Sequence, residues 1–221
     1  MALNWPYGGP QDLPTRIPVF PLTGAILLPR GQLPLNIFEP RYLAMIDDAL
    51  ATHRLIGMIQ PDASKPACAR GPGLFSIGCV GRLTQIAETG DGRYLITLTG
   101  VARFALSGEA EVATAYRQCD VAYEPFAADF APTPDEAGRA GVLDALRRFA
   151  RARRICIDWS GVNETTTETL DNALAMMSPF GAGEKQALLE AGTVSERAGM
   201  LIAMTDMDLA AGGGAGKSSL Q

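Results

Sequence analysis

The segment from Ile17 to Leu50 reads IPVFPLTGAILLPRGQLPLNIFEPRYLAMIDDAL and contains two kinds of hydrophobic periodicity. Leu33, Leu35 and Ile37 alternate with polar residues or proline, and this period of two predicts a strand with one buried face. Pro40 then suits the first position of a helix, because its missing N–H would have no partner there. The apolar residues that follow recur at helical spacing: Tyr42, Met45, Ile46, Ala49 and Leu50. This segment therefore predicts a strand joined by a sharp corner to an amphipathic helix.

Further strands are expected on both sides of this segment. Arg16 to Phe20 (RIPVF) predicts a short strand, and Pro18 within it favours an edge position because proline cannot donate to a ladder. Leu55 to Ile59 (LIGMI) is continuously apolar, as in a strand buried on both faces. Two more strands are expected around 101–106 and 119–123.

A β-hairpin is predicted between Arg82 and Leu98. Its two apolar arms flank the sequence Thr89-Gly90-Asp91-Gly92. Gly90 and Gly92 can adopt the positive φ angles that tight hairpin turns require. The first part of the chain therefore reads as β-structure with one helix.

The pattern changes after this β-rich part. The stretch from Glu124 to Pro134 contains three prolines and little periodicity, which is typical of a linker. Helical patterns follow, with a capping-box sequence at Thr133–Glu136 and a second one at Thr193–Glu196. Helices are expected to begin at the first box, to cover 164–177 and 184–191, and to begin again at the second box. The predicted organisation is an N-terminal arm (1–13), a β-domain (14–124), a linker (125–134), a helical bundle (135–210) and a disordered tail (211–221).

Composition and charge exclude several classes of protein. The 221 residues are 47% hydrophobic and 19% charged, which fits a globular protein. The net charge of −5 argues against binding to a nucleic-acid backbone. No apolar run reaches the about 20 residues that a membrane helix needs, and the first residues do not resemble a signal peptide. A cytoplasmic location is therefore expected.

No residue pattern predicts catalysis, a metal site or a cofactor. The four cysteines (Cys68, Cys79, Cys119 and Cys156) show no metal-ligand spacing, and we expect them to be free thiols that act as small buried apolar residues. The single histidine, His53, has no recognisable nucleophile partner. Lys185 is the one lysine that could serve a serine–lysine dyad, but the leucines around it favour packing. Glu109 and Glu111 are interpreted as solvated charges.

One basic cluster stands out. Five arginines occur between positions 147 and 154, and Arg147, Arg151 and Arg154 share a helical face. This face could bind an acidic partner or RNA. Because no aromatic residue shares the face of these three arginines, the favoured interpretation is a solvated face whose aliphatic stems cover the core.

The motifs together resemble the Lon N-terminal domain family. The first block is Ile17 to Leu50, with Pro18, Pro21 and Leu22 in a Pro-x-x-Pro-Leu turn. Its IFEPRY segment is similar to the short free-standing bacterial members and to the Lon-like domain of cereblon. The second block, 77–104, has the family's Asp-Gly hairpin and a strand that ends in Gly-x-x-Arg, here Gly100 to Arg103. A third block, PFGAGEKQALLEA at 179–191, is similar to a helical segment of the family. The resemblance is weakened at Thr23, where full-length Lon proteases usually carry arginine.

The resemblance implies an α+β fold: a PUA-like β pseudo-barrel in the N-terminal half, followed by a small C-terminal helical bundle. It also implies a non-enzymatic module that binds polypeptide substrates or a protein partner and that lacks the ATPase and protease domains of Lon.

The candidate peptide-binding residues are those of the strand-to-helix corner: Phe38, Glu39, Pro40, Arg41 and Tyr42. The structural alternative puts Phe38 and Tyr42 in the core and pairs Arg41 with a carboxylate. A metal-independent hydrolase and a PUA-like RNA-binding protein remain as alternative functions, and the sequence does not indicate the oligomeric state.

Overall fold

The computed structural model describes residues 7–68, 70–131 and 138–210. Their contacts divide the chain into two compact units. The β-unit comprises Met1–Pro132 and Met176–Glu190, and the helical unit comprises Thr133–Ala175 and Ala191–Gln221. The arm predicted at 1–13 and the tail predicted at 211–221 fall partly or wholly outside the described residues.

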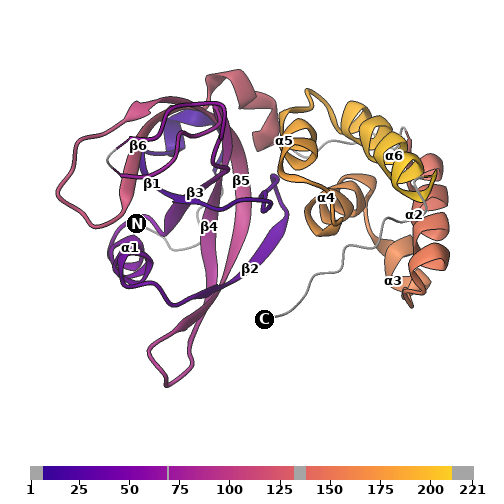
Figure 1. Cartoon of the computed structure of the whole chain (residues 1–221), viewed down its shortest axis with the longest axis horizontal. Helices are drawn as coiled ribbons and strands as arrows, with labels where there is room; N and C mark the ends of the chain where they lie inside the picture. Colours follow the sequence, from indigo (N-terminus) through magenta and orange to yellow (C-terminus); the bar gives the residue numbers. More distant parts are fainter. Residues whose placement is uncertain (1–6, 69, 132–137, 211–221) are drawn as a thin grey trace. The chain divides into compact units, whose positions relative to one another are not determined.

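The β-unit is built on one six-stranded sheet (Figure 1). Its strands are β1 (Arg16–Pro21), β2 (Gln32–Ile37), β3 (Leu55–Ile59), β4 (Ile77–Glu88), β5 (Tyr94–Glu109) and β6 (Arg117–Ala122). The order is β2-β5-β4-β3-β1-β6, and β6 also pairs with β5. Because this second pairing joins the last strand back to an inner one, the sheet closes partly on itself. The expected β pseudo-barrel and the α+β class are thus confirmed.

Strand β1 is not at an edge, so the expectation from Pro18 was wrong. It pairs antiparallel with β6 over Arg16–Val19 and parallel with β3 from Val19 onward. Pro18 therefore lies just before the first residue that is paired with β3. A proline is tolerated inside the sheet here because the pairing between β1 and β3 begins only at Val19. The missing N–H of Pro18 therefore leaves no gap in that ladder.

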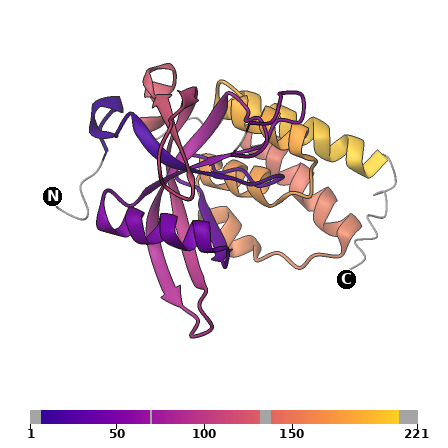
Figure 2. The same ribbon diagram turned by 60° about the vertical axis from the view of Figure 1, so that its left-hand side comes forward.

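The hairpin has the predicted turn but a longer second arm. Gly90 and Gly92 have φ angles of 76° and 82°, and Figure 2 shows the β4–β5 hairpin projecting beyond the other strands. The separate strand expected near 101–106 is the continuation of β5. Gly100 does not break the strand. A Cβ atom at this position would lie 2.0 Å from the carbonyl oxygen of Leu28, so glycine allows the loop backbone to approach.

The core of the β-unit contains the predicted apolar positions. Helix α1 (Pro40–Ala51) buries Tyr42, Met45, Ile46 and Ala49. Strand β3 is buried at every residue, as its continuous apolar sequence indicated. Short 3-10 helices, η1 (Pro10–Asp12) and η2 (Glu124–Phe130), flank the strands. Helix η2 occupies much of the predicted linker.

Within residues 138–210, the structure has five helices: α2 (Arg139–Arg153), α3 (Trp159–Glu164), α4 (Thr167–Met177), α5 (Ala182–Glu190) and α6 (Val194–Ala210). The capping box at Thr193–Glu196 is formed, with Thr193 Oγ1 accepting from the Glu196 N–H at 3.1 Å. The box expected at Thr133–Glu136 lies outside the described residues. Helix α3 was not predicted.

Helix α5 belongs to the β-unit, although the sequence placed it in the helical bundle. Its Gln186 side chain donates to the carbonyl of Ile77 at 3.1 Å. Gln60, which is fully buried, donates to Gln186 Oε1 at 3.1 Å and to the carbonyl of Ala182 at 3.0 Å. These polar contacts fix α5 to the sheet.

The helical unit has a buried carboxylate on α4. Asp171 is fully buried, and its two oxygens accept no hydrogen bond from the described part of the chain. The nearest guanidinium, Arg197, is 3.7 Å away and donates instead to Asn172 at 2.8 Å. The pKa of Asp171 is raised to about 6, because burial raises it and the charge of Glu168 adds to this, while the charge of Arg197 offsets only part of the increase. The folded unit therefore binds a proton at Asp171 more tightly than the unfolded chain does.

We expect the helical unit to become more stable as the pH falls through about 6. Protonation removes the cost of a buried charge in the folded state only, so Asp171 should contribute about 1 kcal/mol of added stability between pH 7 and pH 5. Urea unfolding followed by Trp159 fluorescence, in a Trp5→Phe background, measures this change. The Asp171→Asn variant should lack this contribution. An unchanged pH dependence in that variant would show that the effect comes from another group.

Candidate functional site

The candidate residues lie where β2 turns into α1. Glu39 is the N-cap residue and has an extended backbone, as expected of a residue before proline. Pro40 occupies the first helical position. The corner is therefore fixed by local sequence, in agreement with the structural interpretation of Pro40.

The remaining corner residues have separate environments. Phe38 is 61% exposed and lies 5.9 Å from the guanidinium of Arg93, so the expected core position is wrong for this residue. Tyr42 is 6% exposed and packs on Phe20, with ring centroids 4.2 Å apart. Arg41 pairs with Glu39 at 2.8 Å, and its guanidinium carbon is 4.5 Å from the centroid of the Tyr42 ring.

Arg41 and Tyr42 line a groove of about 490 Å³ on the β-unit. Its apolar lining includes three prolines, Pro21, Pro61 and Pro72. The remaining lining comes from Arg70, Gly71 and the segment from Thr114 to Arg117. The groove thus brings together one part of the predicted corner and two loops that the sequence did not indicate. Phe38, Glu39 and Pro40 do not line it.

The polar groups of the groove are held by other protein groups. Arg117 donates to Glu109 at 2.7 and 2.9 Å and to the carbonyl of Pro72 at 2.8 Å. Arg70 donates to the carbonyls of Val112 and Tyr116. The Tyr116 hydroxyl donates to Asp48 at 2.7 Å. Side chains fixed in this way lose little conformational freedom when a ligand binds.

These contacts also shift the pKa values of titratable side chains in and beside the groove. Burial raises the pKa of Glu109, but the hydrogen bonds and charge of Arg117 outweigh burial, so this pKa lies below its usual value. Glu109 is therefore an ion-pair partner and not the solvated charge that the sequence suggested. Burial and the hydrogen bond to Asp48 raise the pKa of Tyr116 to about 12. The groove therefore presents neutral tyrosines and charged arginines at neutral pH.

Residues considered for catalysis lie apart from the groove. His53 is exposed just after α1, and no hydrogen bond joins it to a serine or cysteine within residues 7–68, 70–131 and 138–210. Lys185 donates to the carbonyl of Met176 at 2.8 Å, and burial lowers its pKa. Across these described residues, no group of three metal-ligating side chains could hold an ion.

The cysteines divide into two pairs. Cys79 and Cys119 are buried as expected, and burial raises the pKa of Cys119 to about 12. Cys68 and Cys156 are exposed, which corrects the expectation for these two. Among the described residues, no helix is both long and apolar enough to span a membrane.

Comparison with known proteins identifies first the fold and then the family. The structure superimposes on that of a Lon N-terminal domain protein from Xanthomonas campestris with a TM-score of 0.61, at 21% identity, over 86% of this chain and 98% of that chain. The N-terminal domain of a Mycobacterium avium complex Lon protease gives a TM-score of 0.60, at 20% identity, with the same coverage. At these identities the likeness establishes the fold alone.

The sequence profile described as the ATP-dependent protease La (LON) substrate-binding domain matches residues 16–206, and the chain belongs to this family. The resemblance in the sequence motifs is thereby confirmed. Lon protease 2 of Sorangium cellulosum is 27% identical over 204 residues, which cover 87% of this chain and 25% of that protein. Lon protease of Parabacteroides distasonis is 26% identical over 201 residues, which cover 88% of this chain and 24% of that protein. The chain thus spans about a quarter of the length of these relatives.

Proposed function

We propose that this chain is a polypeptide-binding module and that the groove beside Arg41 and Tyr42 holds the bound segment. The observation that carries the proposal is the combination of an apolar lining of prolines and tyrosines with arginines held by Glu39, Glu109 and backbone carbonyls. An extended peptide has apolar side chains for such a lining and carbonyl groups that accept from guanidinium edges. The family's description as a substrate-binding domain supports the same class of ligand, because the substrates of a protease are polypeptides.

The corner residues enter the proposal in two roles. Arg41 and Tyr42 would contact the peptide, whereas Glu39 and Pro40 would position them. Phe38 would extend the apolar contact outside the groove, since its ring is exposed next to the sheet edge formed by β2. We further propose that the domain contributes binding and no catalysis, and that it acts in the cytoplasm with a protein partner or substrate.

A bulky residue in the groove should block peptide binding without disturbing the fold. Ala115 is exposed and lines the groove, whereas Ala113 is exposed in the same loop and does not. We expect Ala115→Trp to weaken binding of a fluorescein-labelled peptide of leucine, proline and serine by about tenfold or more, since its indole occupies the apolar lining. Fluorescence anisotropy measures the affinity.

Ala113→Trp is the matched control, because it adds the same side chain two residues away. Its peptide affinity should equal that of the wild type. Equal losses in both variants, or no binding by the wild type, would contradict the proposal. Circular dichroism establishes that both variants are folded.

A further inference from the structure

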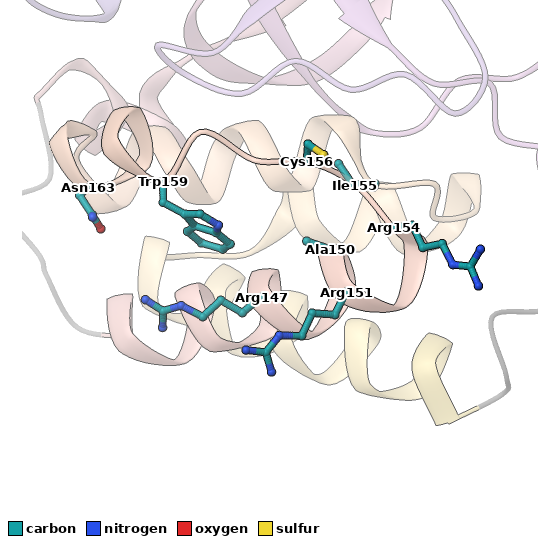
Figure 3. Close-up of a pocket in the computed structure, with 8 residues that line it drawn as sticks. All are labelled: Arg147, Ala150, Arg151, Arg154, Ile155, Cys156, Trp159 and Asn163. Carbon is teal, nitrogen blue, oxygen red and sulfur yellow. The ribbon is translucent and has the colours of Figure 1, made fainter.

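A second concave surface lies on the helical unit, and its lining contains the basic cluster that the sequence singled out. The cavity has a volume of about 510 Å³ and is lined by arginines of α2, the chain after α2 and the first residue of α3. In Figure 3, Arg147 and Arg151 extend from α2 below the ring of Trp159, while Arg154 extends from the far end of the same helix. The site is thus an arginine surface under one aromatic ring.

The local backbone explains how Trp159 reaches this position. Helix α2 ends at Arg153 and is followed by the C-cap residue Arg154, whose φ angle of 55° is left-handed. The Ile155 N–H donates to the carbonyl of Ala150 at 2.9 Å. The chain reverses there and enters α3, where the Asp158 side chain caps the helix by accepting from the Ser160 N–H at 3.1 Å. The first residue after this cap is Trp159. Its ring centroid is 5.3 Å from the guanidinium carbon of Arg147.

The arginines in and directly after α2 fall into two groups, those that pair with a carboxylate and those that do not. Arg148 pairs with Asp144 at 2.9 Å and also with Asp206. Arg153 pairs with Asp208 at 2.7 Å. Arg147, Arg151 and Arg154 make no ion pair with a carboxylate in the described part of the chain, and all three line the cavity. Among the described residues, carboxylates therefore pair with Arg148 and Arg153 but not with the three arginines that line the cavity.

The helix dipole explains only part of this arrangement. Cations near a helix C-terminus are stabilising within the last turn, which accounts for Arg151 and Arg154. Arg147 lies further from that end, and like charges at a spacing of four residues destabilise a helix, as for Arg147 and Arg151. An anion bound between these two guanidiniums would remove this repulsion.

The cavity also has an apolar part. Trp159 is half-buried, Ala150 is buried and Ile155 is 49% exposed. An aromatic ring beside the face of Arg147, Arg151 and Arg154, whose absence favoured a merely solvated face, is supplied here by Trp159 of α3. The site can therefore receive an anionic group and an apolar side chain at the same time.

We propose that this cavity binds an acidic polypeptide segment, with a carboxylate at Arg147 and Arg151 and a neighbouring apolar or aromatic side chain against Trp159 and Ile155. The proposal rests on the proposed polypeptide-binding function and adds a second contact surface with its own ligand chemistry. A peptide is favoured over RNA for two reasons. Single-stranded RNA binds along extended basic grooves with several stacking rings, whereas this cavity has one ring, and the chain has a net charge of −5.

The test uses the full chain and a short fluorescein-labelled peptide in which glutamate and phenylalanine alternate. We expect the double substitution Arg147→Gln with Arg151→Gln to weaken binding by about tenfold or more, because charge-assisted hydrogen bonds are lost. Arg148→Gln is the matched control, since it removes the same charge from the same helix on the side that faces Asp144 and Asp206. This control should bind like the wild type once circular dichroism shows that it is folded.

Two further probes separate the alternatives. A peptide with glutamine in place of glutamate should bind at least about tenfold more weakly than the acidic peptide. Added salt should weaken the binding of the acidic peptide but not that of the glutamine peptide. Equal binding of the two peptides, unchanged binding by the double variant, or tighter binding of oligouridine would overturn the inference. Binding of the uncharged leucine–proline–serine peptide without the acidic one would overturn it while leaving the groove of the β-unit intact.

Discussion

Replacing Asp129 with alanine is expected to destabilise the β-unit by about 3–5 kcal/mol, since it removes the carboxylate that pairs with the buried guanidinium of Arg103. Asp129 accepts from the Arg103 backbone N–H at 2.9 Å, from Nε at 2.9 Å and from Nη2 at 2.8 Å. The two side chains are only 6% and 9% exposed. Arg103 also donates to the carbonyl of Leu189 at 3.2 Å and lies 4.8 Å from the Phe126 ring centroid. This pair therefore joins β5, η2 and α5.

The measurement is urea unfolding followed by the near-ultraviolet circular dichroism of tyrosine, because the chain's five tyrosines all belong to the β-unit. A double variant, Arg103→Met with Asp129→Leu, should lose less stability than Asp129→Ala, since it leaves no buried charge unpaired. A loss below about 1 kcal/mol for Asp129→Ala would mean that water or another group replaces the carboxylate.

Gly100→Ala is expected to destabilise the same unit by about 3 kcal/mol through overpacking. The added Cβ would lie 2.0 Å from the carbonyl oxygen of Leu28, which is a backbone atom and cannot rotate away. The Gly100 N–H also donates to the carbonyl of Gly31, and its own carbonyl accepts from the Arg30 N–H, both at 2.8 Å. Any shift that relieves the clash therefore strains these hydrogen bonds.

Gly108→Ala is the matched control for this substitution. Gly108 is on the same strand, and a Cβ there would meet nothing within 4 Å. Its unfolding free energy should change by less than about 0.5 kcal/mol. Similar losses for the two variants would attribute the effect to backbone entropy of glycine and not to the approach of the loop.

The elements predicted correctly from sequence are those whose signals are local. The β4–β5 turn follows from Gly90 and Gly92, and the start of α1 follows from Pro40. Helix α3 was missed because its six residues have no apolar periodicity and depend on the Asp158 cap. The docking of α5 was missed because the sequence of a helix shows which face is apolar but not which unit it packs on. Its attachment uses Gln60 and Gln186, two polar residues 126 positions apart.

The candidate site was predictable only in part for the same reason. The corner from Phe38 to Tyr42 was proposed because it carries the IFEPRY motif of the family resemblance, and the structure places Arg41 and Tyr42 of this motif in the groove. Most of the other lining residues come from Arg70–Pro72 and Thr114–Arg117, which follow no periodic pattern. The arginine cavity was likewise predictable only in part. Its arginines lie close together in the sequence, whereas Trp159 reaches the cavity only because the chain reverses after α2.

The placement of α5 has a consequence for biosynthesis. The chain passes from the β-unit to the helical unit, returns for Met176–Glu190, and leaves again. During synthesis on the ribosome, the strands of the β-unit emerge first, but Gln60 and Arg103 lack their partners in α5 until Glu190 has been made. Most of the helical unit is translated inside this interval. The order of translation therefore differs from the order in which the two units can be completed, and the nascent β-unit stays unfinished until the segment Met176–Glu190 has been synthesised.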